Sequence, residues 1–284
     1  MGPGASSAAH AWRPGLAIAD VMRSMTACKT LLGRSDMKLG VIGVGHLAVA
    51  MLHGLLRAGH APRSIMLSPR GQGRHLAQTR DFALAQDNAQ IVAECDLVLL
   101  AVRPDDAPGA VRGLPWRSGQ VLLSACAGVP IAALEAGPAQ VMRIMPITAS
   151  KLGASPTLAY PDLPEARALL DAIGTTIALR SEDEFEAATV SAAMYGWAQA
   201  LIRTGANWTA AHGIDADDAR QLVARSFTAA GRMIAEEDAP MDEILDSLCT
   251  PGGITRQGID QLEDKAVPEA WEGACDAILA RLRG

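Results

Sequence analysis

The sequence predicts an α/β fold in two parts: a doubly wound sheet, then an all-α region. From Lys38 to about Arg180, short β-branched or Leu-rich runs alternate with helical patterns, which is typical of βαβ units around a parallel sheet. Most of these runs are apolar on both faces, as in a sheet that is covered on both sides. After Ser181 the strand-like runs disappear and long helical patterns take over. The expected domains are therefore 37–181 and 182–284.

The expected elements of the first part follow in chain order. Strands are expected at Lys38 to Ile42, Ser64 to Leu67, Leu97 to Val102, Gln120 to Ser124, Val141 to Ile144 and Thr175 to Ala178. Helices are expected between them at about Leu47 to Ala58, Gly73 to Gln78, Asn88 to Glu94, Ile131 to Ala136 and Pro164 to Ile173.

The second part is expected to be helical throughout. The helices are predicted at Glu182 to about Ala211, Ala216 to Glu237, Met241 to Ser247, Gly258 to Ala266 and Pro268 to Leu282. Asp215 is placed to cap the second of them, after Gly213 as a helix stop. The first is apolar around most of its circumference, and such a helix is usually buried on every side. We therefore expect a subunit interface here and a homodimer, or a larger homo-oligomer built on dimers.

The bulk composition excludes several classes of protein. A net charge of -6 argues against a nucleic-acid partner, and no apolar run is long enough to span a membrane. The five cysteines are scattered without a CxxC pair or a Cys/His cluster, which predicts reduced thiols in a cytoplasmic protein and no metal site. Residues 1–36 lack clear periodicity and are interpreted as a disordered or loosely attached extension.

A glycine-rich turn follows the first expected strand and opens a helix. It reads Gly43-x-Gly45-x-x-Ala48, a pattern that holds the pyrophosphate of a nicotinamide dinucleotide when it stands between a strand and a helix. Gly43 permits the tight turn, Gly45 lets the backbone approach the phosphates, and Ala48 allows close helix packing.

The residues at the end of the second strand indicate which dinucleotide is bound. An acidic residue at this point binds the ribose 2′-hydroxyl of NAD, whereas Arg or Ser accepts the 2′-phosphate of NADP. Ser68 and Arg70 stand here without an acidic neighbour, and Arg74 follows. These residues favour NADP(H), and NAD(H) is the alternative cofactor. The interpretation without a cofactor contact is a solvated basic loop.

Two further strand ends and one distant turn carry small or polar residues. Pro104 ends the third apolar run, and the fourth runs into Ala125, Cys126 and Ala127, where small side chains let the backbone lie close to a nicotinamide. Plain core packing would explain both equally well.

In the helical part, the turn from Thr250 to Thr255 contains Pro-Gly-Gly and opens toward a helix, which predicts an anion site for a substrate carboxylate.

With these motifs in this order, the chain from Met37 onward resembles the pyrroline-5-carboxylate reductase family. The matching segments are Ile42 to Leu47, Ser68, Asn88, Ala101 to Pro104, Ser124 to Gly128, Arg143 to Pro146 and Thr250 to Thr255. The resemblance implies an NAD(P)H-dependent reductase with an N-terminal Rossmann domain and a C-terminal helical dimerisation domain. It also implies reduction of a small cyclic imino acid, pyrroline-5-carboxylate to proline, as the last step of proline biosynthesis.

The resemblance also implies roles for individual residues. The dinucleotide would be contacted by Ile42, Gly43, Val44, Gly45, His46, Leu47, Ser68, Asn88, Ala101, Val102, Arg103 and Pro104. Its nicotinamide end would lie near Ala125, Cys126 and Ala127. Those that would hold the substrate are Thr250, Gly252, Gly253, Ile254 and Thr255, with the Thr255 hydroxyl near the ring nitrogen as the catalytic group. In the family this turn works across the dimer, so each site would need two subunits.

Two segments depart from the family pattern and keep other functions open. The family's Met-Pro-Asn-Thr-Pro is Met-Pro-Ile-Thr-Ala at 145–149, and its Gly-Ser-Gly-Pro-Ala-Tyr is replaced by Ala192 to Trp197. An imine or ketimine reductase with another substrate would account for both, and a dinucleotide-binding protein without turnover is a third hypothesis. A β-hydroxyacid dehydrogenase would need a lysine on the long helix, and none occurs between Lys151 and Lys265.

Overall fold

The structure, a computed structural model, describes residues 37–284; the expected N-terminal extension at 1–36 lies outside the described residues. The described chain forms one eight-stranded sheet in the order β3-β2-β1-β4-β5-β6-β7-β8. The strands are β1 (Leu39–Ile42), β2 (Ile65–Leu67), β3 (Ala83–Leu84), β4 (Leu97–Leu100), β5 (Val121–Ser124), β6 (Gln140–Met145), β7 (Ser155–Tyr160) and β8 (Gly174–Ala178). Neighbouring strands are parallel except β6 and β7. The predicted fold class is confirmed.

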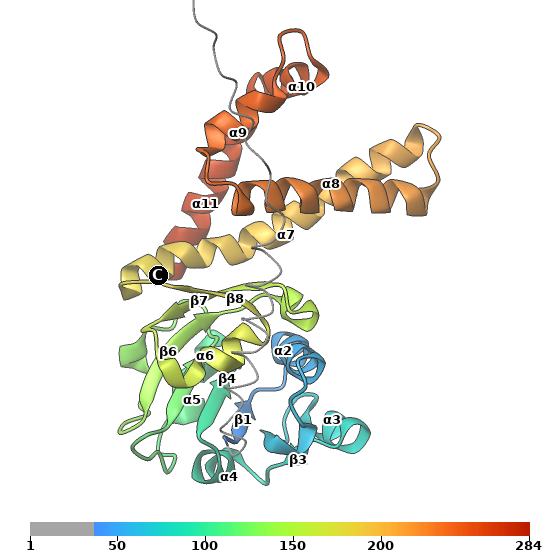
Figure 1. Cartoon of the computed structure of the whole chain (residues 1–284). Helices are drawn as coiled ribbons and strands as arrows, with labels where there is room; N and C mark the ends of the chain where they lie inside the picture. The colour runs from blue at the N-terminus through green and yellow to red at the C-terminus, as the bar shows by residue number, and fades with distance from the viewer. Residues whose placement is uncertain (1–36) are drawn as a thin grey trace, which may run out of the picture.

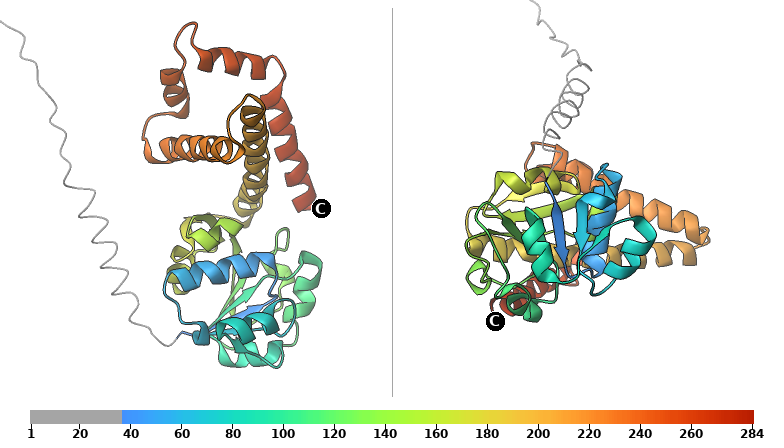
Figure 2. Two further views of the ribbon diagram at one scale, coloured as in Figure 1. Left: turned by 90° about the vertical axis from the view of Figure 1, so that its right-hand side faces the viewer. Right: turned by 90° about the horizontal axis from the view of Figure 1, so that it is seen from below.

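Helices cover both faces of this sheet (Figures 1 and 2). The α-helices are α2 (His46–Arg57), α3 (Gly73–Arg80), α4 (Asn88–Glu94), α5 (Ala107–Val111) and α6 (Pro164–Asp171). Short 3-10 helices are η1 (Pro62–Ser64), η2 (Pro104–Asp106), η3 (Ile131–Ala133) and η4 (Thr148–Leu152). One buried cluster lies on the α2 and α6 side and another on the α4 and α5 side. Every residue of β1, β4 and β5 is buried, as two covered faces require.

The structure differs from the sequence predictions at four places in this part, one of which is the unpredicted helix α5. The expected helix at Ile131 to Ala136 is only the short η3, because the backbone becomes extended at Leu134, whose side chain is buried in the core cluster on the α4 and α5 side. Strands β3 and β7 were not predicted. In β7 the polar Ser155 and Thr157 are buried and share a hydroxyl hydrogen bond of 2.9 Å, so no apolar run marks the strand.

Five helices make up the rest of the chain, standing beyond the end of the sheet (Figure 1). They are α7 (Glu182–Ala211), α8 (Ala216–Glu236), α9 (Met241–Leu248), α10 (Ile254–Glu263) and α11 (Val267–Arg283). Asp215 caps α8 as predicted, because its carboxylate accepts from the backbone N–H groups of Asp217 and Asp218. The predicted helix at Gly258 to Ala266 is displaced: α10 begins at Ile254, directly after the Gly253 cap.

The helical region leaves large apolar side chains uncovered. Leu222 is 59% exposed, Trp208 65% and Ile254 89%, and many others from α7 to α11 are similar. The long α7 buries only Phe185, Thr189 and Val190 within this chain. Apolar surface of this extent marks a contact with another molecule. None of the helices within 37–284 is long and apolar enough to cross a membrane.

A buried ion cluster joins the sheet to the first turns of α7. Arg143 on β6 is 1% exposed, and its guanidinium donates to Glu182 at 3.1 Å and to Glu186 at 2.6 Å. The same guanidinium lies 4.5 Å from the centre of the Phe185 ring. Glu182 also accepts from the backbone N–H of Ile131 at 2.8 Å. This cluster fixes where α7 leaves the sheet.

Candidate functional site

The two glycines of the turn have different surroundings. Gly43 has a φ of +90°, and a Cβ there would lie 2.6 Å from Val102 Cγ1 and 2.8 Å from the carbonyl of Ala101. Gly45 caps α2 without a side-chain hydrogen bond, and a Cβ there would meet nothing within 4 Å. The first backbone N–H groups of α2 therefore face open space, which is the geometry that binds phosphate.

The loop after β2 is held against this turn. Ser68 is buried, and its hydroxyl accepts from the backbone N–H of Gly43 at 3.2 Å. Gln72 donates from its backbone to the Val44 carbonyl at 3.0 Å, beside the bridge between Val44 and Gly71. These contacts hold the intervening Arg70 next to the glycine turn. The Arg70 guanidinium forms no ion pair within residues 37–284.

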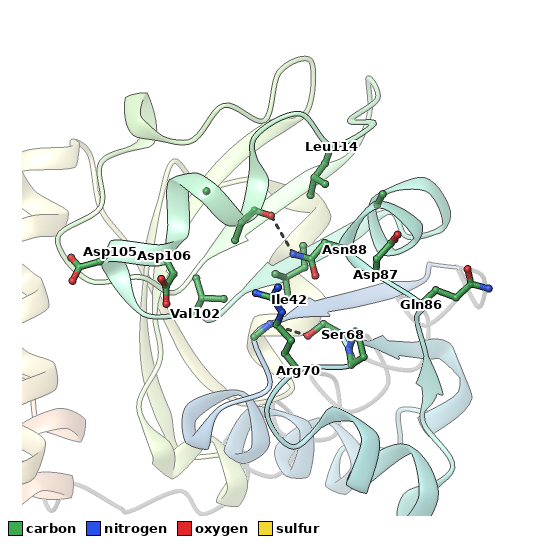
Figure 3. Close-up of a pocket in the computed structure, with 15 residues that line it drawn as sticks. Ile42, Ser68, Arg70, Gln86, Asp87, Asn88, Val102, Asp105, Asp106 and Leu114 are labelled. Carbon is green, nitrogen blue, oxygen red and sulfur yellow. Dashed lines mark hydrogen bonds between the residues drawn. The ribbon is translucent and has the colours of Figure 1, made fainter.

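A cavity of about 770 Å³ opens beside the turn (Figure 3). Its walls come from the ends of β1, β2 and β4, the start of α4, and α5 with the residues before and after it. The predicted cofactor residues among its lining are Ile42, Gly43, Ser68, Arg70, Asn88 and Val102. Figure 3 shows Asp105 and Asp106 at one end of the cavity and Gln86 at the other. The volume and the position at the carboxyl ends of parallel strands suit a nucleotide.

Other predicted cofactor residues are not part of the cavity lining. These are Val44, Gly45, His46, Leu47, Ala101, Arg103, Pro104, Ala125, Cys126 and Ala127. His46 is exposed at the first position of α2, whereas Val44 is buried. Arg103 and Pro104 are exposed where η2 begins.

The turn after β5 is packed tightly. Cys126 is buried and its thiol donates to the Val102 carbonyl at 3.5 Å, which ties the β5 turn to the residues after β4. Burial raises the pKa of the Cys126 thiol. A neutral, buried thiol favours the packing role over a nucleophilic one. A Cβ on Gly128 would lie 3.4 Å from the Leu282 carbonyl, so the end of α11 reaches this turn.

The predicted substrate turn lies far from the cavity within one chain (Figure 1). It joins α9 to α10, where the Thr250 carbonyl accepts from the Gly253 N–H at 2.8 Å and Gly252 has a φ of +73°. Thr250, Gly252, Ile254 and Thr255 are exposed, and no residue of this turn lines the cavity. A single chain therefore does not bring the two predicted halves of the site together.

Several cavity residues were not anticipated from the sequence. They are Pro69, Gln86, Asp87, Ala89, Asp105, Asp106, Gly109, Ala110 and Leu114. Asp87 caps α4 through the backbone N–H of Gln90, and the amide of Asn88 donates to the Ala110 carbonyl at 3.3 Å, joining α4 to α5. The Asx cap ahead of α4 was a usable sequence signal. The α5 wall was not, because so short a helix has no clear periodicity.

Comparison with known proteins yields a consistent family. Residues 182–284 match the family model described as pyrroline-5-carboxylate reductase dimerisation, and 38–128 match that described as NADP oxidoreductase coenzyme F420-dependent. The chain is 28% identical over 255 residues to a pyrroline-5-carboxylate reductase of Methanosarcina acetivorans, covering 84% of this chain and 94% of the relative. It is 25% identical over 253 residues to pyrroline-5-carboxylate reductase 2 of Bacillus subtilis, covering 82% and 89%.

A solved structure supports the same fold. Plasmodium falciparum pyrroline carboxylate reductase with NADP bound superposes with a TM-score of 0.77 at 20% identity, over 87% of this chain and 97% of that chain. The matched helical region, the glycine turn and the similarity over most of the length agree: residues 182–284 match the dimerisation region of pyrroline-5-carboxylate reductases, and the chain as a whole is similar to reductases of that family.

Proposed function

We propose that the protein is an NADPH-dependent reductase that converts pyrroline-5-carboxylate to proline. The observation that carries the proposal is the combination of a phosphate-binding turn at Gly43 with a helical region matched to this reductase family. Relatives named for this activity are similar over more than four-fifths of the chain. The reaction is the last step of proline biosynthesis.

The residues around the cavity fit a nicotinamide dinucleotide. Gly43 permits the tight turn, and Gly45 leaves room for a pyrophosphate at the start of α2, where the helix dipole attracts negative charge. Arg70 is positioned to pair with a 2′-phosphate, which supports NADPH over NADH. When bound, NADPH supplies the hydride for reduction of the C=N bond.

The protein's own groups position the substrate. A protonated cyclic imine is already electrophilic, so catalysis depends on orientation and electrostatics more than on a strong acid. We assign the carboxylate to the turn from Thr250 to Thr255 of a second subunit, because in one chain this turn is exposed and lies away from the cavity. The uncovered apolar side chains of α7 to α11 supply the surface for a homodimer.

Reduction of a different cyclic imine is the second candidate. Ile147 and the Ala192 to Trp197 segment depart from the family, and both lie where β6 and α7 approach each other. A panel of cyclic imino acids distinguishes the candidates by the rate of NADPH oxidation. Preference for pyrroline-5-carboxylate supports the proposal, and a higher kcat/KM for another imine favours the second candidate. Intact NADPH binding without oxidation of any member points to a protein without turnover.

Two pairs of variants test the site assignments. Arg70→Ala should weaken NADPH binding and leave NADH binding unchanged, whereas Arg74→Ala, on an exposed position outside the cavity lining, should change neither. Thr255→Ala should lower kcat/KM for the imine without changing NADPH affinity. Equal effects of Arg70→Ala on both dinucleotides would contradict the assignment to the 2′-phosphate.

The described cysteines agree with a reducing compartment. Cys95, Cys126, Cys249 and Cys275 form no disulfide with one another, and the first two are buried. We propose a cytoplasmic location on this ground. Tracking a fluorescent fusion of the full chain in cells tests it.

A further inference from the structure

Two hydroxyl groups meet where the helical region crosses the edge of the sheet. Thr148 is the first residue of η4, and its Oγ1 donates a hydrogen bond to the Tyr195 Oη on α7 over 3.4 Å. Both side chains are half-buried. This bond uses the Thr148 proton, so the Tyr195 proton is available to another acceptor.

The pair lies close to the strand ends expected to face the nicotinamide. Because β4, β5 and β6 are parallel, the residues that follow them gather at one edge of the sheet. Thr148 follows the end of β6 at Met145 by three residues. Ala127, after β5, packs with Ala192 of α7 against the cluster that contains Met145. Tyr195 is one helical turn beyond Ala192 and therefore on the same face of α7.

The neighbouring Trp197 belongs to a different contact. Its ring lies 5.2 Å from that of Trp271 on α11, edge to face at 89°. Side chains two positions apart on a helix point in directions that differ by about 200°, so Tyr195 faces away from α11. The Tyr195 hydroxyl thus points to the strand ends, while Trp197 packs against Trp271 of α11.

We propose that Tyr195 is the proton donor to the imine nitrogen and that Thr148 positions its hydroxyl. The proposal rests on the imine reduction proposed above. In the neutral imine, as the ring carbon receives hydride from the reduced cofactor, the electron pair of the C=N bond moves to nitrogen, which takes up a proton. The Tyr195 O–H bond breaks and the new N–H bond forms. The phenolate then regains a proton from water, with Thr148 holding the oxygen in place.

The alternative source of this proton is the Thr255 hydroxyl of a second subunit, which the family resemblance places near the nitrogen. The two sources predict different behaviour as pH changes. A neutral imine needs a proton from the protein, whereas an imine already protonated in acid does not. Loss of the true donor therefore costs less activity at low pH than at high pH.

The test compares wild-type protein with Tyr195→Phe, which removes the hydroxyl and keeps the ring. In the alkaline range kcat/KM for pyrroline-5-carboxylate should fall by about 100-fold, with unchanged NADPH binding by fluorescence. The ratio of wild type to variant should shrink as the pH is lowered. The effects of other ionisable groups on the pH profile cancel in this ratio, because both proteins contain the same groups. On the surrounding elements these groups are Arg143, Lys151, Tyr160, Glu186 and Arg203.

Further variants test the positioning role of Thr148. Thr148→Val should lower kcat by about tenfold, less than the roughly 100-fold or more that a general acid itself contributes, and Thr148→Ser should restore it because the hydroxyl returns. Thr255→Ala should lower kcat/KM by the same factor at every pH if that turn holds the carboxylate.

Each outcome of these measurements decides the proposal. Unchanged activity in Tyr195→Phe overturns it, as does a loss that is constant with pH, which would indicate packing. A loss confined to high pH in Thr255→Ala but not in Tyr195→Phe assigns the proton to Thr255. Wild-type protein that binds NADPH but does not reduce the imine overturns the proposed function itself, and this assignment with it.

Discussion

Gly43 and Gly45 lie two residues apart in the glycine turn between β1 and α2, and their surroundings differ. Gly43→Ala would place a Cβ 2.6 Å from Val102 in a left-handed backbone, so we expect a loss of about 1–3 kcal/mol in unfolding free energy and of NADPH binding. Gly45→Ala meets no atom within 4 Å and should keep its stability. It should weaken NADPH binding by about tenfold, because the methyl group occupies space meant for phosphate.

Urea unfolding and NADPH fluorescence titration of the two glycine variants separate these effects. Unaltered NADPH affinity in Gly45→Ala would place the pyrophosphate somewhere other than the start of α2.

Cys95 makes stability depend on pH in the alkaline range. Burial raises the pKa of this thiol from 9.0 to about 11. Between these values the unfolded chain loses the proton and the native chain keeps it, so the free energy of unfolding decreases as pH rises. As the pH rises from about 8 to about 10.5, the free energy of unfolding should decrease less in Cys95→Ala than in wild type. Urea unfolding at both pH values measures this, and equal losses in the two proteins would contradict it.

At the scale of elements, Arg143 connects β6 to α7. Arg143→Met removes the cation that two glutamates share in a buried setting, and breaking such a cluster costs about 3–5 kcal/mol. Thermal or urea unfolding should show this loss, with part of it recovered when Glu186→Gln is added. Arg232→Met, which breaks the exposed pair with Glu236 on α8, should cause no measurable change. A similar effect of the two arginine substitutions would show that the cluster does not hold α7.

At the scale of the whole molecule, the separation of the turn from the cavity predicts that two subunits share each site. Gly43→Ala and Thr255→Ala should each be nearly inactive as pure dimers. A mixed dimer contains one site with both intact halves, so random one-to-one reassembly should restore about a quarter of wild-type activity. Activity after mixing and refolding the two variants measures this recovery. Absence of recovery, with mixed dimers shown by mass spectrometry, would place both halves in one subunit.

The sequence by itself determined the α/β fold, the helical second half and the glycine turn between β1 and α2. These features arise from local signals: buried parallel strands are apolar runs, helices repeat every 3.6 residues, and Gly43 is required by its own backbone. Ser68 and Arg70 could be placed at the cavity because they follow the second strand, and Asn88 through the family resemblance.

Only the tertiary structure decided the rest. It revealed β7 as an antiparallel strand whose buried hydroxyls satisfy each other, and it brought Asp105 and Leu114 to the cavity wall from around a helix too short to show periodicity. It also separated the roles of Tyr195 and Trp197, which the apolar helix alone leaves equivalent. The physical reason is common to all three: contacts between residues distant in the chain depend on how the elements pack, and no local periodicity encodes that packing.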